Sequence, residues 1–202
     1  MKANCNFVNM LKNFPYSIIL GSASPRRQEL LNSLGVPFSV EPIHANEEFP
    51  MSLKGEEIPL YLSEKKSHCF PRVLDKDELL ITSDTIVWHN GRVMNKPLDF
   101  KEAVSMLSKL SGDCHEVFTG VCIRTKDHTL SFVEATRVYF RKLDPEEIEF
   151  YVKNYPVYDK AGSYGAQDWI GHIGIERIEG SYFNVMGLPI HLLYQKLRQF
   201  NS

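Results

Sequence analysis

The sequence predicts an α/β fold in which helices flank a mixed central β-sheet. Short apolar runs with strand character alternate along the chain with segments whose apolar residues recur at helical spacing. Two of the strand-like runs are joined by Asn90-Gly91, a dipeptide that favours a tight antiparallel hairpin. This order of elements favours a mixed sheet covered by helices.

The first predicted strand and helix lie between Tyr16 and Gly35. The run YSIILGS is short and apolar, and it predicts a buried strand. Ser24 is the expected N-cap of the helix that follows, and Pro25 is its expected first residue. Gly35 stands where a C-cap is expected. The apolar face of this helix would be formed by Leu30, Leu31 and Leu34.

The next part of the chain combines two strands, an acidic loop and a helix. PFSVEPI predicts a strand, residues 45–50 (ANEEFP) predict an acidic loop, and residues 58–70 predict a helix. A second apolar strand, in LLITSDTIV, is expected to end at Asp84 before the chain enters the hairpin.

The second half contains two helices with clear start signals. Asp99 and Glu102 predict a capping box for the helix in DFKEAVSMLSKLSG, and Asp144 and Glu147 do the same for DPEEIEFYVKNY. The remaining segments are expected to be two long strands (116–124 and 129–143), a glycine-rich loop (159–167), strand structure (169–185) and a last helix (187–200).

Length, charge and cysteine content limit the possible classes of protein. The chain has 202 residues, enough for a single domain over residues 16–202 after an N-terminal extension at 1–15. The net charge of -2 gives no global basic field, so no nucleic-acid partner is expected. No apolar run suits a signal peptide or a membrane span, and the four cysteines match no zinc pattern. A cytoplasmic protein with reduced thiols and no membrane partner is therefore expected.

Two arginines stand at the one end of a helix that disfavours cations. Arg26 and Arg27 occupy the first turn of the predicted helix, where the helix dipole is already positive. A bound anion would resolve this conflict, and phosphate fits best because arginine binds its oxygens bidentately. Ser22 and Ser24 would add hydroxyl donors. The alternative is that both arginines simply point into solvent.

Carboxylates and lysines elsewhere predict further contacts to such an anion. Asp84 is expected to face a cleft at the carboxyl edge of the sheet, unless it bonds nearby backbone in a turn. Glu47 and Glu48 are adjacent, so at most one should point inward, and that one together with Asp84 could hold Mg²⁺. Lys66 and Lys96 are candidate phosphate ligands, although single lysines are usually solvated.

Lys160 begins a glycine-rich loop whose backbone could approach a ligand, but glycine also makes ordinary turns.

The motifs of several common catalytic chemistries are absent from this sequence. The sequence has no GxSxG elbow, no Walker A motif and no HxxxH pair. The residues alone therefore predict a hydrolase or transferase that acts on a phosphorylated small molecule, without identifying the reaction.

Six stretches together resemble the Maf family of nucleoside triphosphate pyrophosphatases, also called septum formation inhibitors. They follow the family's order and cover the chain from about Tyr16 to its end. The sequence departs from the family at Gly21 and Ser67, where alanine is common, and in the N-terminal extension. None of these departures removes a charged group. The stretches are LGSASPRRQELL, SDTIVWHNGRVMNKP, EAVSMLSKLSG, HEVFTGV, DKAGSYGAQ and GSYFNVMGLPI.

The resemblance implies a fold and a reaction. It implies an elongated α/β structure with a cleft between two lobes, usually as a homodimer. Such proteins cleave a nucleoside triphosphate between the α- and β-phosphates, with a divalent metal such as Mg²⁺ or Mn²⁺, and release a nucleoside monophosphate and pyrophosphate. Some also accept modified pyrimidine nucleotides, which is consistent with a house-cleaning role, and a link to septum formation is implied.

The resemblance also implies roles for individual residues. Asp84 matches the proton acceptor of the family, and Glu48 matches its metal pocket. The matching substrate-pocket residues are Ser22, Arg26, Arg27, Lys66 and Lys96. Members that prefer dTTP and UTP resemble this sequence at Arg26, Thr85 and Gln167.

Two alternative functions stay open at this stage. One is a pyrophosphatase with another base preference, such as 7-methyl-GTP, which Thr85 and Gln167 disfavour by resemblance. The other is a nucleotide-binding regulator of cell division without catalysis, which is disfavoured by the presence of Asp84, Glu48, Lys66 and Lys96.

Overall fold

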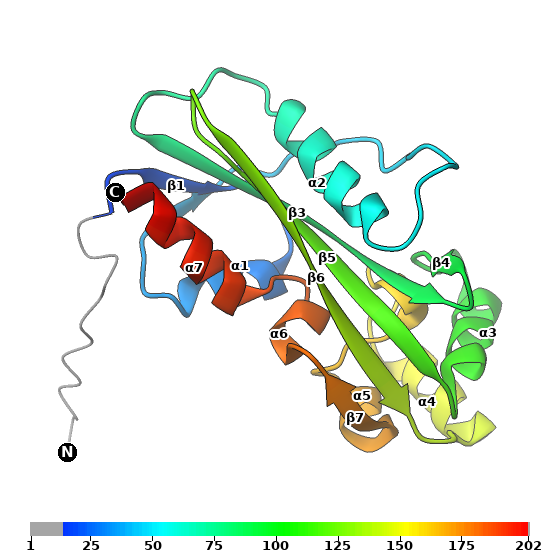
Figure 1. The fold of residues 1–202 in the computed structure, drawn as a ribbon. Helices are drawn as coiled ribbons and strands as arrows, with labels where there is room; N and C mark the ends of the chain where they lie inside the picture. Colours follow the sequence, from blue (N-terminus) through cyan, green and yellow to red (C-terminus); the bar gives the residue numbers. More distant parts are fainter. Residues whose placement is uncertain (1–13, 202) are drawn as a thin grey trace, which may run out of the picture.

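A seven-stranded mixed sheet forms the centre of the computed structural model, which describes residues 14–201 (Figure 1). Strands β2, β1 and β3 pair in parallel, and all other pairs are antiparallel, as expected for a mixed sheet. The order is β2-β1-β3-β5-β6-β7, and β4 forms the predicted hairpin with β3. The strands are β1 (Ser17–Leu20), β2 (Phe38–Val40), β3 (Glu78–His89), β4 (Arg92–Met94), β5 (Cys114–Arg124), β6 (Thr129–Phe140) and β7 (Ile175–Glu179).

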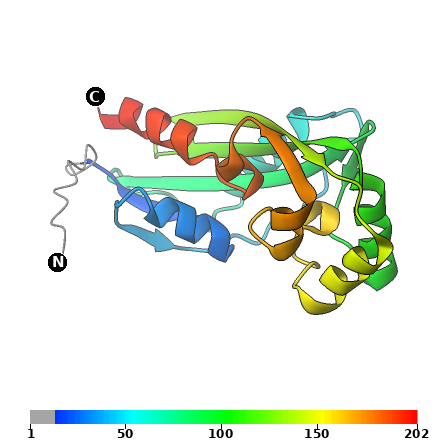
Figure 2. The same cartoon turned by 90° about the horizontal axis from the view of Figure 1, so that it is seen from below.

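Helices cover both faces of this sheet. Helix α2 packs on one face, and the other helices lie on the opposite face or at the far end of the sheet (Figures 1 and 2). The predicted capping residues Asp99 and Asp144 begin α3 and α4. The helices are α1 (Pro25–Asn32), α2 (Glu57–His68), α3 (Phe100–Leu110), α4 (Pro145–Asn154), α5 (Trp169–Gly174), α6 (Tyr182–Val185) and α7 (Ile190–Leu197), with 3₁₀ turns at Ala161–Ser163 and Arg198–Asn201.

The expectation of strand structure throughout residues 169–185 was wrong. This segment forms α5, then β7, then α6. Asp168 is the N-cap residue of α5, and the Ser181 side chain accepts a hydrogen bond from the backbone N–H of Asn184 to begin α6. Gly171 allows α5 to pack closely, because a Cβ there would lie 2.2 Å from the carbonyl oxygen of Ala166.

Two separate apolar cores lie on the same face of the sheet. One packs α1 and α7 on the first half of β3, around Leu79 and Ile81. The other packs α3, α4 and α5 around Val87. The polar residues Ser83 and Thr85 lie between them on β3. This division corresponds to the two lobes that the resemblance implied.

Helix α2 is held close to the opposite face by a glycine. A Cβ at Gly120 of β5 would lie 2.2 Å from the carbonyl oxygen of Pro59, so no larger residue fits beneath the first turn of α2. Gly120 pairs with Asp84 in the sheet register. The close packing therefore brings the later turns of α2 over the middle of β3, where Thr82 donates a hydrogen bond to the carbonyl of Ser63.

No helix within residues 14–201 combines the length and the apolar character needed to cross a membrane. The predicted extension at 1–15 lies almost wholly outside the described residues.

Candidate active site

A cavity of about 660 Å³ opens where the edge of β3 is unpaired. Strand β1 pairs with β3 as far as Ile81, and β4 pairs with it only from Val87 onward. Among the described strands, β3 residues 82–86 therefore pair with β5 alone. Both faces of this part of β3 border the cavity, since Asp84 and Ile86 point towards α2 and Thr85 points the opposite way.

The expectation that the strand ends at Asp84 was wrong. Strand β3 continues to His89 because its antiparallel pairing with β5 runs without a break from Leu80 to Trp88. The parallel partner β1, however, ends at Leu20, opposite Ile81. Asp84 therefore still lies beyond the carboxyl end of the parallel pair, where α/β sheets commonly bind ligands.

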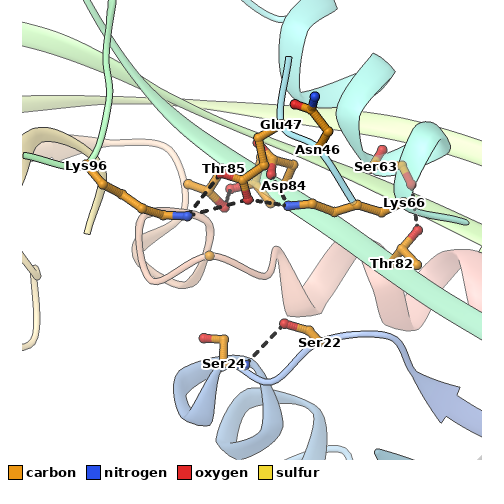
Figure 3. A network of polar contacts seen from close by, with 12 residues as sticks. Ser22, Ser24, Asn46, Glu47, Ser63, Lys66, Thr82, Asp84, Thr85 and Lys96 are labelled. Atoms are coloured by element: carbon orange, nitrogen blue, oxygen red, sulfur yellow. Dashed lines mark hydrogen bonds and ion pairs between the residues drawn. The ribbon is translucent and has the colours of Figure 1, made fainter. Parts of the chain in front are cut away.

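Asp84, Lys66 and Glu47 form a closely spaced group on the α2 side (Figure 3). The Lys66 ammonium lies 2.5 Å from Asp84 Oδ1 and 2.9 Å from Glu47 Oε1. Lys96 approaches from beyond the hairpin, and its Nζ lies 3.1 Å from Glu47 Oε2. Asp84 is only 6 % exposed, so its carboxylate depends on Lys66 for compensation. The structure thus brings together the predicted site residues Asp84, Lys66 and Lys96, which come from separate parts of the chain.

Glu47, and not Glu48, is the glutamate that reaches the cavity. Burial alone would raise the pKa of Glu47, but the neighbouring Lys66 and Lys96 outweigh burial and lower this pKa to about 2. Within residues 14–201, Glu48 makes its hydrogen bonds through the backbone: its N–H donates to Asn46 Oδ1, and its carbonyl accepts from Lys65. The sequence indicated that at most one of the two glutamates should point inward, but it carried no signal for which one.

Arg27 lies across the cavity from this group and has no carboxylate within ion-pair distance in residues 14–201. Its guanidinium donates to the carbonyl of Gly187 at 2.9 Å, to Thr85 Oγ1 at 3.1 Å and to Ser22 Oγ at 3.4 Å. Burial lowers the pKa of Arg27 from its usual value, an effect that the charge of Asp84 opposes. A half-buried guanidinium whose hydrogen bonds within residues 14–201 all go to neutral oxygens favours an external anion beside it.

The start of α1 offers further donors to that anion. The Ser24 side chain accepts no capping hydrogen bond, and the Ser24 N–H donates to Ser22 Oγ at 3.3 Å (Figure 3). Arg26 lines the cavity, and its Nη1 lies 3.2 Å from Asp159 Oδ2. Neither arginine points simply into solvent, because each contacts a group from a distant part of the chain.

Thr85 is held in place by a polar network that sequence reasoning missed. Its hydroxyl lies 2.9 Å from Thr119 Oγ1, and the Thr119 hydroxyl donates to the carbonyl of Asn184 at 3.0 Å. Asn184 is fully buried, and its amide donates to Thr136 and to the carbonyl of Val117. Polar residues at isolated positions in apolar strands were the only available signal, and such residues are common in strands.

Gln167 lines the same cavity from the loop at 159–167. Its Oε1 is buried and has no hydrogen-bond partner among the described residues. A buried acceptor without a donor costs free energy, and a ligand N–H would remove that cost. The structure therefore places Gln167 on one wall of the cavity and the Asp84 group on another.

The carboxylates fit a divalent cation that is completed by substrate oxygens. Residues 14–201 contain no group of three or more His, Cys, Asp or Glu side chains that could hold a metal ion. Asp84 and Glu47, however, already bring one oxygen each to a single cationic nitrogen. Mg²⁺ typically takes one or two carboxylates, with waters and substrate phosphates as its other ligands.

Comparison with known proteins gives matches over nearly the whole chain. The family model described as "Maf-like protein" matches residues 17–200. A Bacteroides fragilis protein named "dTTP/UTP pyrophosphatase" is 49% identical over 94% of this chain and 100% of its own length. A Phocaeicola vulgatus protein of the same name is 50% identical over the same shares. The solved Ham1 protein of Staphylococcus aureus aligns with a TM-score of 0.46 and 13% identity, over 89% of this chain and 99% of its own.

Proposed function

The chain belongs to the Maf family, and on this basis we propose that it is a nucleoside triphosphate pyrophosphatase that acts on dTTP and UTP. Water would attack the α-phosphorus, and the bond to the bridging oxygen of the β-phosphate would break. The products are the nucleoside monophosphate and pyrophosphate. The observation that carries this proposal is the position of Arg27, a half-buried guanidinium with no ion-pair partner within residues 14–201, which faces the Asp84–Lys66–Glu47 group across one cavity.

Cationic side chains would bind the triphosphate from both walls. Arg26 and Arg27, with Ser22 and the first turn of α1, would bind phosphate oxygens from one side. Lys66 and Lys96 would bind them from the other side. Negative charge grows on these oxygens as the leaving pyrophosphate departs, so fixed cations stabilise the transition state more than the substrate.

Asp84 is the best-placed proton acceptor. Its buried carboxylate lies on the cavity wall and pairs with Lys66 alone among the described residues, so it could accept the proton of the attacking water. Asp84 and Glu47 would hold a divalent cation, and we place Glu47 in the role that the resemblance gave to Glu48. That cation supplies charge neutralisation for the phosphates when bound.

Thr85 and Gln167 would read the base. The Gln167 amide can accept from one atom and donate to another, as the N3–H and O4 of uracil and thymine require. Its unpaired buried Oε1 supports this role. The Thr85 hydroxyl is oriented by Arg27 and Thr119, which links the base-reading side to the phosphate-binding side.

Pyrophosphate release from a panel of nucleoside triphosphates tests the proposal. The panel contains dTTP, UTP, CTP, GTP and 7-methyl-GTP, each with Mg²⁺, with Mn²⁺ and with a chelator. We expect metal-dependent release from dTTP and UTP well above the others. A preference for 7-methyl-GTP would overturn the base assignment, and nucleotide binding without any release would favour a non-catalytic regulator.

A homodimer is also expected from the family resemblance. Sedimentation of the purified protein tests it, with a species of twice the chain mass expected. A single monomeric species at micromolar concentration would contradict it.

A further inference from the structure

Lys160 is a buried lysine at the start of the loop that carries Gln167, and none of the roles above uses it. The side chain is only 4 % exposed. Its ammonium lies 3.0 Å from Asp159 Oδ1 and 3.6 Å from Asp168 Oδ2, and it also donates to the carbonyl of Pro156. A buried ammonium is costly unless it is paired, so this arrangement ties together the two ends of the loop at residues 159–168.

We propose that Lys160 is a positioning residue for base discrimination, whose ammonium fixes the loop that presents Gln167 to the nucleotide. This inference rests on the function proposed above, because it assumes that Gln167 faces the base. It assigns no direct substrate contact to Lys160, since three protein oxygens already surround the ammonium.

At the Asp168 end of the loop, the side chains of Asp168 and Gln167 pack closely around Gly165. A Cβ at Gly165 would lie 2.7 Å from Asp168 Oδ2 and 2.9 Å from Gln167 Nε2. Both side chains therefore pack against Gly165 and lie close together. We expect a shift of Asp168 to disturb the packing of the Gln167 amide, because interiors are close-packed.

Tyr151 of α4 forms hydrogen bonds to the same part of the loop. Its hydroxyl donates to Asp168 Oδ2 at 2.7 Å and accepts from the backbone N–H of Gly165 at 3.2 Å. The Tyr151 side chain is fully buried, so its hydroxyl needs these hydrogen-bond partners. Lys160 and Tyr151 therefore both contact Asp168 Oδ2.

At the Asp159 end, the same ammonium is linked to the phosphate-binding side. The Lys160 ammonium lies 3.0 Å from Asp159 Oδ1, and the Arg26 guanidinium lies 3.2 Å from Asp159 Oδ2. The loop thus spans from an arginine expected to bind phosphate to a glutamine expected to bind the base. Loss of the Lys160 charge should loosen the base-binding end most, because no hydrogen bond from residues 14–201 holds the Oε1 of Gln167.

The test compares Lys160→Met with Lys153→Met. Lys153 is an exposed lysine on α4 that pairs with Glu149 and lies over the Phe100 ring, and it has none of the roles proposed above. For each protein, kcat and KM are measured with UTP and CTP, and inhibition by inorganic tripolyphosphate is measured separately. We expect the UTP-to-CTP ratio of kcat/KM to fall by about tenfold in Lys160→Met, as loss of one well-placed hydrogen bond predicts. Tripolyphosphate inhibition should change by less than about threefold, and Lys153→Met should match the wild type.

A second variant and a second measurement guard against a folding defect. Tyr151→Phe keeps Lys160 and the aromatic ring but removes both hydroxyl contacts of Tyr151. It should lower the same ratio in the same direction. Amide hydrogen exchange in the ligand-free proteins should rise within residues 159–168 for both variants, relative to Lys153→Met.

The possible results separate the two proposals. An unchanged nucleotide ratio and unchanged exchange in folded Lys160→Met would overturn the positioning role. An equal loss of kcat for UTP and CTP would also overturn it, because it would place Lys160 in the chemistry. Failure of the wild type to hydrolyse dTTP and UTP would instead overturn the proposed function, and the exchange measurement would still decide the role of Lys160.

Discussion

Acid should destabilise this protein through one buried histidine, His115. The side chain is 2 % exposed, its Nε2 lies 2.7 Å from the Tyr164 hydroxyl, and the ring stacks on Phe140. Burial, with a smaller contribution from His89, lowers the pKa of His115 to about 3. The folded protein therefore keeps this imidazole neutral at pH values where the unfolded chain protonates it.

The sign and size of the effect follow from linkage. Between the unfolded pKa of about 6.5 and the folded pKa of about 3, the unfolded state binds the extra proton, so stability falls as pH falls. Each pH unit in this window costs up to about 1.4 kcal/mol. At pH 4.5 the loss attributable to His115 is therefore about 3 kcal/mol, a large fraction of the 5–15 kcal/mol typical of a domain.

Urea denaturation at pH 7, 5.5 and 4.5 measures this loss. His115→Asn keeps a polar group that can accept from Tyr164 but cannot titrate, so its free energy of unfolding should fall less steeply with acid. His44→Asn, at an exposed loop position, is the matched control and should follow the wild type. Protonation of carboxylates in acid changes the free energy of unfolding of all three proteins by the same amount, so it cancels in the comparison. If the His115→Asn and wild-type curves stayed parallel from pH 7 to 4.5, the assignment to His115 would be refuted.

Four further predictions concern the cavity and its support. Asp84→Asn should lower kcat by about 10²–10⁴-fold while nucleotide binding persists; steady-state kinetics and calorimetry check this, and full activity would exclude Asp84 as the proton acceptor. Glu47→Gln should weaken the metal dependence of turnover while Glu48→Gln leaves it unchanged, as metal titrations of both variants would show; the reverse result would restore the role to Glu48. Arg27→Ala should raise KM for UTP by about tenfold or more, since it removes charged hydrogen bonds to phosphate, and an unchanged KM would place the triphosphate elsewhere. Gly120→Ala should cost about 1–3 kcal/mol of stability by overpacking against Pro59, measured by urea denaturation, and a neutral result would mean that α2 can shift without cost.

Local signals in the sequence were sufficient to predict many of the helices and turns of this fold. The hairpin at Asn90-Gly91 and the helices begun by Asp99 and Asp144 form as expected, because a turn or a capping residue acts on its immediate neighbours. The short helices α5 and α6 were missed because their six and four residues carry too little periodicity to outweigh an apolar, strand-like composition.

Features that depend on distant partners could not be predicted in this way. The length of β3 is set by its pairing with β5, so its continuation past Asp84 is invisible in the local sequence. The choice of Glu47 over Glu48 depends on where Lys66 and Lys96 lie in space. The support of Thr85 by Thr119 and Asn184 likewise joins residues far apart in the chain.

The unpaired edge of β3 has a consequence for the behaviour of the protein at high concentration. Free strand edges can pair with other chains and lead to aggregation. Here the free edge spans only residues 82–86, and β1 and β4 cover β3 on either side of it. The two neighbouring strands therefore prevent a long intruding strand from aligning with β3. The same interruption of pairing that gives a small molecule access to the sheet is thus too short to act as a template for intermolecular β-structure.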